Sequence, residues 1–303
     1  MSGWVDLQVN GFAGVDFNSD TFDDDSAIDA ATAITNDGVR MALATIITAP
    51  LDLMVQRIKH IANLIDQYSE FGDAIGGIHI EGPFLNPESG YIGAHPPDCA
   101  MPSNIDIAKR LVDAGRGHVR MMTLAPEMDT DAAVTRWLAD HSILVSAGHC
   151  GPELDQLKRH IDQGLRMFTH LGNGCPAIQP RHDNIIQRVL HLSDQIAISF
   201  IADGHHVPPV ALSNYLRCVP NENIIIVSDA ICAAAMPPGE YRFSHQKVTV
   251  MDDRSAWAPG GKHYAGCATT MSQMRDVLRD QLSVSHERSR RWMSHNPERL
   301  LGR

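Results

Sequence analysis

The 303-residue chain contains no apolar run long enough to cross a bilayer and no basic-then-apolar leader at its start. It is also poor in basic residues: 25 Lys and Arg stand against 36 Asp and Glu, so the formal net charge is −11. An acidic balance of this size argues against nucleic acid or an anionic membrane as partner. The missing leader and membrane span predict a cytoplasmic protein. Because the chain is acidic, binding of an anionic small substrate would need a local basic cluster.

The six cysteines form no CxxC pair. Without that spacing, and without any sign of secretion, reduced thiols are expected rather than a disulfide framework. Cys150 directly follows His149 and could lie near a functional site, but the favoured interpretation is a small buried hydrophobic side chain.

Short β-branched or apolar runs recur at wide spacing along the chain. The predicted strands are Trp4–Val9, Arg40–Thr48, Ala74–Glu81, His118–Leu124, Ser142–Ala147, Arg166–His170, Gln195–Ile201 and Asn223–Ser228. Runs such as LATIIT and IIIVS are almost continuously apolar, as expected of strands that are covered on both faces.

Amphipathic segments separate most of these runs. The predicted helices include Leu51–Tyr68, Ile105–Ala114, Asp131–Asp140, Glu153–Gln163 and Pro208–Cys218, with further helical material around Ser272–Leu282 and Pro297–Leu301. Eight strands alternating with helices predict an α/β fold of the (β/α)8 TIM-barrel type. An open doubly wound sheet is the competing interpretation, but no GxGxxG follows the first strand.

Two segments interrupt the alternation. The Pro- and Gly-rich segment Leu85–Met101 follows the third strand and is long enough to form a lid or a substrate loop. The segment Gly239–Ala265 contains a strand-like YRFSHQKVTV run and a Pro-Gly-Gly turn, which predict a β-hairpin excursion. Residues 1–303 are otherwise expected to form a single barrel domain.

Four polar residues stand at the C-terminal ends of four predicted strands: Glu81, His149, His170 and Asp229. Each alone is more often a structural residue, such as a satisfied core histidine or a capping carboxylate. Together they indicate one site, because parallel strands bring their C-terminal ends to the same face of a barrel. Two imidazoles and a carboxylate suit a divalent cation, and Asp229 would then serve as a general base.

Several sequence blocks, in a fixed order, are similar to those of the N-acetylglucosamine-6-phosphate deacetylase family of the amidohydrolase superfamily. They are HIEGPFLNPE…GAHP, SAGH, FTHLGN, IADGHHV and VSDA, and the resemblance extends from VDLQVNGFAG to HNPERLLG. It implies a metal-dependent barrel enzyme that removes acetate from an amino-sugar phosphate. The alternatives are an amidohydrolase that acts on an unphosphorylated amino sugar, on the galactosamine epimer or on a cyclic amide, a non-catalytic sugar-phosphate-binding barrel, and a phosphosugar isomerase on the same fold.

The resemblance also implies roles at the metal. Glu81, His149 and His170 match the family's metal ligands, and Asp229 matches its catalytic aspartate. His95, in GAHP, matches the histidine that polarises the acetamide carbonyl. Zinc is the expected ion, one per subunit, with iron, cobalt and manganese as alternatives.

Other matched residues imply a phosphate end of the pocket. His206 matches a substrate-binding histidine, and Asn173 and Gly174 match positions that bind phosphate. Arg181 matches an arginine that reaches the phosphate from the neighbouring subunit of a homodimer. These donors would supply the local basic cluster that an anionic substrate needs.

The chain departs from its relatives at two places. Many superfamily members carry His-x-His in the first strand as ligands of a second metal, where this chain has Gln8 and Asn10. Neutral amides are poor substitutes, so one tightly held metal is expected, with His79 as an inward-facing supporting residue. Family members usually have a small β-sandwich domain, and this chain, which begins almost at its first strand, is expected to have little or none of it.

Overall fold

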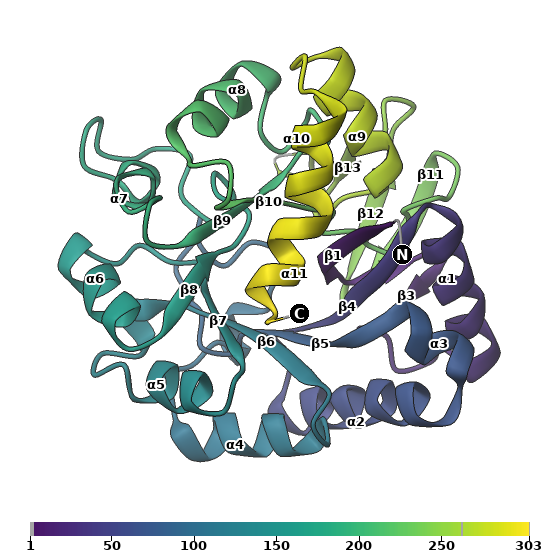
Figure 1. The fold of residues 1–303 in the computed structure, drawn as a ribbon. Coiled ribbons are helices and arrows are strands. Elements are labelled where there is room, and N and C mark those ends of the chain that lie inside the picture. The colour runs from purple at the N-terminus through teal and green to yellow at the C-terminus, as the bar shows by residue number, and fades with distance from the viewer. Residues whose placement is uncertain (1–2, 262, 303) are drawn as a thin grey trace.

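The computed structural model describes residues 3–261 and 263–302. Eight parallel strands follow one another in chain order around a barrel, and helices surround them (Figure 1). The strands are β1 (Trp4–Val9), β4 (Val39–Ile47), β5 (Ile75–Glu81), β6 (Val119–Leu124), β7 (Leu144–Ala147), β8 (Leu165–Phe168), β9 (Ala197–Ile201) and β10 (Ile224–Val227). The predicted barrel is confirmed, and the predicted strand ends differ from these by at most two residues.

The barrel closes between β10 and β1 through side chains as well as backbone. One parallel bridge joins Val9 to Ala230, just beyond the end of β10. The buried Asp6 carboxylate accepts the backbone N–H of Ser228 at 3.1 Å, which replaces a ladder hydrogen bond at this seam. The ring is therefore nearly closed, and the carboxyl ends of all eight strands face one side.

Helices of the outer ring follow most of the strands. They are α1 (Asp24–Asn36), α2 (Leu51–Gln67), α3 (Ser69–Ala74), α4 (Ile105–Ala114), α5 (Ala133–Asp140), α6 (Leu154–Asp162), α7 (Ile185–His191) and α8 (Pro209–Cys218). α1 lies outside the predicted helices because its buried face is mostly alanine, which gives a weak apolar periodicity. No helix in the described part of the chain is long and apolar enough to span a membrane.

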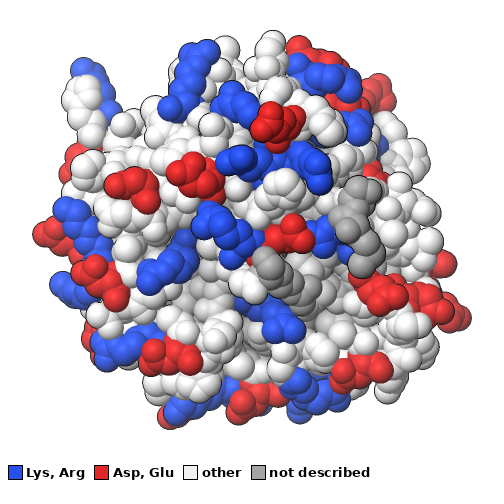
Figure 2. All heavy atoms as spheres, in the orientation of Figure 1, with Lys and Arg blue, Asp and Glu red and all other residues white. Residues whose placement is uncertain are grey.

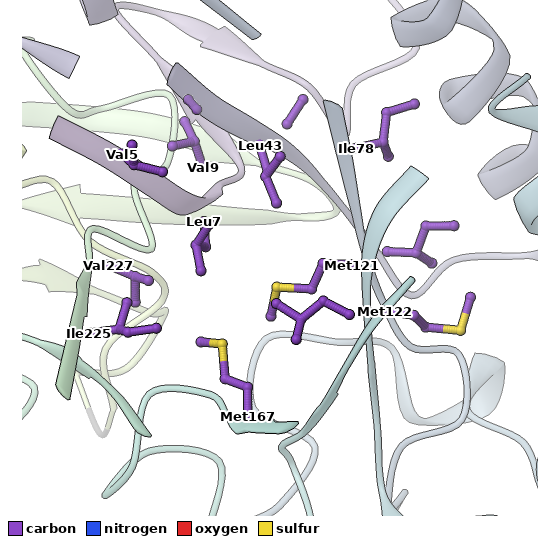
Figure 3. Close-up of a cluster of buried hydrophobic side chains, with 14 of the residues drawn as sticks. Val5, Leu7, Val9, Leu43, Ile78, Met121, Met122, Met167, Ile225 and Val227 are labelled. Atoms are coloured by element: carbon purple, nitrogen blue, oxygen red, sulfur yellow. The ribbon is translucent and has the colours of Figure 1, made fainter. Parts of the chain in front are cut away.

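The barrel interior is filled by apolar side chains from several strands. Leu7, Met121 and Met167 point toward one another inside the ring, beside Leu43 (Figure 3). All four are fully buried. These side chains come from β1, β4, β6 and β8 and fill the ring, so the barrel is a packed core and not a channel.

The last helical run crosses the amino-terminal end of the barrel, whereas α9 (Met271–Asp280) lies in the outer ring (Figure 1). The run consists of α10 (His286–Arg290), a π-helical turn (Arg291–His295) and α11 (Asn296–Leu300). The Ser294 hydroxyl donates to the carbonyl of Gly3, and the Asn296 amide donates to the carbonyl of Ile224, each where a strand begins. On the face seen in the same orientation, acidic and basic side chains are interspersed (Figure 2). The opposite, carboxyl-terminal end stays open.

Two small sheets stand beside the barrel. β2 (Gly11–Phe12) pairs with β3 (Val15–Asp16) directly after β1. β11 (Gly239–Phe243) pairs antiparallel with β12 (Gln246–Val250), which also pairs with the short β13 (Ala256–Trp257). The segment Leu85–Met101 contains one short 3-10 turn at Pro97–Cys99 and otherwise runs as a loop.

Candidate metal centre and active site

The four strand-end residues meet at the carboxyl end of the barrel. Glu81 is the last residue of β5, and His149, His170 and Asp229 each follow β7, β8 and β10 by two residues. The backbone φ angles of these three are +52°, +33° and +51°, in the left-handed region that non-glycine residues rarely adopt. Strain of this kind persists where the surrounding structure fixes it, and it clusters at functional sites.

Glu81 is the centre of the cluster and is 2% exposed. Its Oε1 lies 3.1 Å from Nε2 of His170 and 3.5 Å from Nε2 of His149. Ligand atoms bound tetrahedrally to one zinc ion at about 2.0–2.1 Å stand roughly 3.3 Å apart. Both separations are close to this spacing, so each histidine could share a divalent cation with Glu81.

The protonation of this cluster also suits a cation. His149 donates its Nδ1–H to the carbonyl of Tyr91 at 2.7 Å, which leaves Nε2 as the ring nitrogen that faces Glu81. Ligating histidines commonly make this second hydrogen bond. Burial alone would raise the pKa of Glu81, but His149 and His170 hold that pKa well below its usual value, so the carboxylate stays ionised.

His95 approaches the same carboxylate from the Leu85–Met101 loop. Its Nδ1 accepts the backbone N–H of Thr48 at 3.3 Å, which places the ring hydrogen on Nε2, 3.7 Å from Oε2 of Glu81. Glu81, His95 and His149 form a compact group that could also hold a cation. Burial and the neighbouring His149 lower the pKa of His95 to about 3. His95 is therefore a neutral Nε2–H donor, whereas His170 offers the closer nitrogen to Glu81.

Asp229 is held at one oxygen and free at the other. Its Oδ1 accepts hydrogen bonds from the amides of Asn10 at 2.7 Å and Gln8 at 3.1 Å. Gln8 also donates to Glu81 at 3.0 Å and accepts from the Thr169 hydroxyl at 2.8 Å, which fixes which way its amide faces. Among the described residues, none donates a hydrogen bond to Oδ2 of Asp229.

The electrostatics of Asp229 favour proton transfer. Burial, with a further contribution from the Glu81 carboxylate, raises the pKa of Asp229 above its ordinary value although His170 opposes the rise. A carboxylate with a raised pKa is a stronger base than a free aspartate. Asp229 can accept a proton at Oδ2 and return it to an acceptor in the same pocket.

A pocket of about 940 Å³ opens above the cluster. The predicted residues that line it are Asn10, Glu81, His95, His149, His170, Asn173, Gly174, His206 and Asp229. Gln8 and His79 lie below its floor, where His79 contacts the hydroxyls of Thr45 and Thr123. Arg181 does not line the pocket and is exposed on the loop between β8 and α7.

The carboxylate that holds His206 was not predicted. Asp203 Oδ2 lies 2.7 Å from Nδ1 of His206, and the Asp203 side chain is almost completely buried. Burial would raise the pKa of Asp203, but His206 lowers it to about 2. Burial opposes protonation of His206, yet Asp203 raises the pKa of its ring. The pair presents a cationic imidazole to the pocket, as an anionic ligand requires.

This pair should make stability depend on pH in metal-free protein. The depressed Asp203 pKa stabilises the fold above the unfolded value near pH 3.9, and this contribution is lost as pH falls toward 2. The raised His206 pKa stabilises the fold below about pH 6.5, and this contribution is lost as pH rises through the folded value. Wild type should exceed His206→Gln in unfolding free energy by about 2 kcal/mol near pH 5 and by less at pH 3 and pH 9.

Urea unfolding of both proteins across this pH range checks the expectation. A difference that stays constant from pH 3 to pH 9 would mean that the Asp203–His206 pair is not charged in the folded protein.

Other supporting residues had weak or no signals in the sequence. Thr48 ends a predicted strand and Thr169 precedes His170, but nothing in one sequence shows which atom a hydroxyl contacts. Asp203 lies three residues before His206 in the ADGHHV block, a spacing that could have suggested the pair. Trp257 and Tyr264 line the pocket from the segment around β13 with their ring centroids 4.4 Å apart, and no motif marks them.

Known proteins resemble this chain along nearly its whole length. No protein-family model matches the chain. Human N-acetylglucosamine-6-phosphate deacetylase is 31% identical over 99% of this chain and 74% of its own length. N-acetylgalactosamine-6-phosphate deacetylase of Escherichia coli O157:H7 is 30% identical over 99% and 77%.

Solved structures of the same kind of enzyme resemble this fold. The crystal structure of N-acetyl-D-glucosamine-6-phosphate deacetylase from Mycobacterium smegmatis superimposes with a TM-score of 0.89 at 28% identity. The match covers 99% of this chain and 78% of that one. Sequence and structure therefore agree along nearly the whole chain. The chain belongs to the N-acetylglucosamine-6-phosphate deacetylase family.

Proposed function

We propose that this chain hydrolyses the acetamide of N-acetylglucosamine-6-phosphate to glucosamine-6-phosphate and acetate, a step of amino-sugar catabolism. The observation that carries the proposal is the position of Asp229, a carboxylate of raised pKa beside Glu81 and His170 at the floor of the pocket. A site that only binds a sugar phosphate has no use for a base at that place.

Glu81, His149 and His170 would hold one divalent cation, with zinc as the expected ion and iron, cobalt or manganese as alternatives. When bound, such an ion acidifies a water molecule and polarises an amide carbonyl. A single ion at this cluster is supported by Gln8 and Asn10, because they are neutral amides whose NH2 groups donate to carboxylates where imidazole ligands of a second ion would stand.

The chain's own residues would manage the protons of the reaction. Asp229 takes a proton from the attacking water at Oδ2 while Gln8 and Asn10 keep Oδ1 in place. His95 donates its Nε2–H to the amide oxygen as that atom gains negative charge. Asp229 then gives the same proton to the departing nitrogen, so the base is regenerated and acetate and a free amine leave.

The other end of the pocket would bind the 6-phosphate. His206 carries a positive charge stabilised by Asp203, and Asn173 and Gly174 line the same wall. Arg181 lies outside the pocket of its own chain, which supports the proposal that it reaches the site of a neighbouring subunit in a homodimer. Such a contact would complete the binding of a dianion.

A substrate panel tests the proposed function. Acetate release should be fastest with N-acetylglucosamine-6-phosphate and much slower with unphosphorylated N-acetylglucosamine, because the phosphate contacts are lost. N-acetylgalactosamine-6-phosphate is the second candidate substrate, since the Escherichia coli relative carries that name. A faster reaction with the galactosamine epimer would reassign the sugar, and no acetate from any of the three would refute the deacetylase function.

Arg181→Ala should raise KM for the phosphorylated sugar about tenfold or more and change kcat little, because the residue binds a part of the substrate that does not react. The neighbouring His182→Ala is the matched control and should keep the wild-type KM. Steady-state kinetics at several substrate concentrations separates the two parameters. An unchanged KM in Arg181→Ala would exclude the assigned role.

A mixed dimer tests whether Arg181 acts across subunits. An Arg181→Ala subunit paired with an Asp229→Asn subunit has one site with both residues intact. At a low substrate concentration, an equal mixture should recover about a quarter of wild-type activity, since half of the dimers carry one complete site of two. An activity of the mixture no higher than the mean of the two separate variants would mean that Arg181 acts in the site of its own subunit or takes no part in the site.

We further propose that residues 1–303 act as one cytoplasmic barrel domain, with the β11–β13 sheet as an excursion from it. In support, Phe243 and Val248 of that sheet pack in one buried cluster with Ile47 of β4 and with Ile231, which follows Asp229. The excursion is thus continuous with the mouth of the barrel, where Phe243 also lines the pocket.

A further inference from the structure

A second group of metal-binding side chains lies at the wall of the same pocket. Asp203 and His206 belong to the loop after β9, and Cys267 lies shortly before α9. Asp203 Oδ2 is 2.7 Å from Nδ1 of His206 and 3.5 Å from Sγ of Cys267, and the three ligand atoms all lie within 4.8 Å of one another. None of the three side chains belongs to the Glu81 cluster.

The Cys267 thiol has no role in the proposed hydrolysis. It is fully buried, and burial together with Asp203 raises its pKa well above the ordinary value, so without a cation it stays protonated. Its backbone is fixed beside the active-site strand, because its N–H donates to the carbonyl of Asp229 and its carbonyl accepts from Ile231. A rigidly held thiol that points at a buried carboxylate and an imidazole is an arrangement that soft divalent cations favour.

We propose that Asp203, His206 and Cys267 bind a second divalent cation of the zinc class, through Oδ2, Nδ1 and Sγ. Binding would release two protons, one from the thiol and one from Nδ1 of His206, so the net charge of the cluster stays the same. Nε2 of His206 is not a ligand in this arrangement and stays available to the pocket. The cation would tie the loop after β9 to the start of α9 and so hold His206 in place.

The distances support this ligand set. Zinc bonds of about 2.0 Å to nitrogen or oxygen and about 2.3 Å to sulfur place tetrahedral ligand atoms roughly 3.3–3.5 Å apart. The Asp203–Cys267 separation of 3.5 Å already matches, whereas Asp203 and His206 would move apart by about half an ångström once their shared proton has left. An imidazole ring at the end of a loop can make that change by a small side-chain rotation.

Cobalt distinguishes the two sites because only this one contains sulfur. The full-length protein is stripped of metal and titrated with Co²⁺, and its absorption is recorded. Two equivalents should bind, and the second should add a thiolate-to-cobalt charge-transfer band in the near ultraviolet. If the wild-type protein binds only one equivalent of Co²⁺, or binds two without the charge-transfer band, the proposal is wrong.

Variants identify the sulfur. Cys267→Ser should lose the charge-transfer band and keep the visible cobalt spectrum of the Glu81 site, which also reports that the variant is folded. Cys175→Ser is the matched control, since Cys175 lines the main pocket near His149, and it should keep the band. A band that survives in Cys267→Ser, or that disappears in Cys175→Ser, would assign the thiolate elsewhere and contradict the proposal.

Discussion

Replacing Asp229 with Asn is expected to reduce kcat about 10³-fold or more while the metal content stays at the wild-type level. The amide cannot accept the proton of the attacking water or return one to the departing amine, so both proton transfers lose their carrier. Asn still accepts hydrogen bonds from Gln8 and Asn10 at the Oδ1 position, so the shape of the site is preserved.

The measurement is acetate release together with metal analysis of the same protein sample. Asp194→Asn, an exposed aspartate before β9, is the matched control and should keep full activity. Asp229→Asn activity near wild type would exclude Asp229 as the base. Loss of the metal together with activity would instead make Asp229 a ligand.

Replacing Glu81 with Gln should remove the metal itself. Glu81 is the one carboxylate beside the two histidines proposed to hold the catalytic cation, and its Oε1 faces both His149 and His170. Mutation of residues that only orient metal ligands typically lowers metal affinity 10–100-fold, so replacing the charged ligand itself should lower the affinity more than about 100-fold. Activity should fall in proportion and return in part at high concentrations of added metal.

Metal content after dialysis, measured beside activity, checks this expectation. Glu127→Gln is the matched control because Glu127 is another largely buried carboxylate, bonded to Asn86 and to the N–H of Gly151, and it lies outside the cluster. The control should retain its metal. Glu81→Gln protein that keeps both a full equivalent of metal and wild-type activity would show that the cation is held elsewhere.

The barrel and the convergence of its polar residues could be predicted from one sequence because both follow from local patterns. Buried parallel strands are recognised as short apolar runs, and polar residues within two positions of the end of the run mark where each strand stops. Glu81 ends β5, and His170 and Asp229 follow β8 and β10 by the same number of residues. Once eight such strands alternate with helices, barrel closure places these residues on one face.

The supporting contacts could not be predicted because they join residues far apart in the chain. Thr169 donates to Gln8 across 161 residues, and His95 contacts Thr48 across 47. A hydroxyl carries no sign of its partner in a single sequence, which is why Thr169 was missed. Arg181 differs again: it is exposed in one chain, and its proposed role depends on a subunit contact that a single chain does not contain.

The most direct test of the account is acetate release by the wild-type protein from N-acetylglucosamine-6-phosphate. The release is measured before chelation, after chelation and after one equivalent of zinc is returned. Acetate and free amine should form in equal amounts, disappear on chelation and return with that one equivalent, because the Glu81 site alone supports the chemistry. Turnover that survives complete removal of the metal, or zinc-loaded protein that releases no acetate, would contradict it.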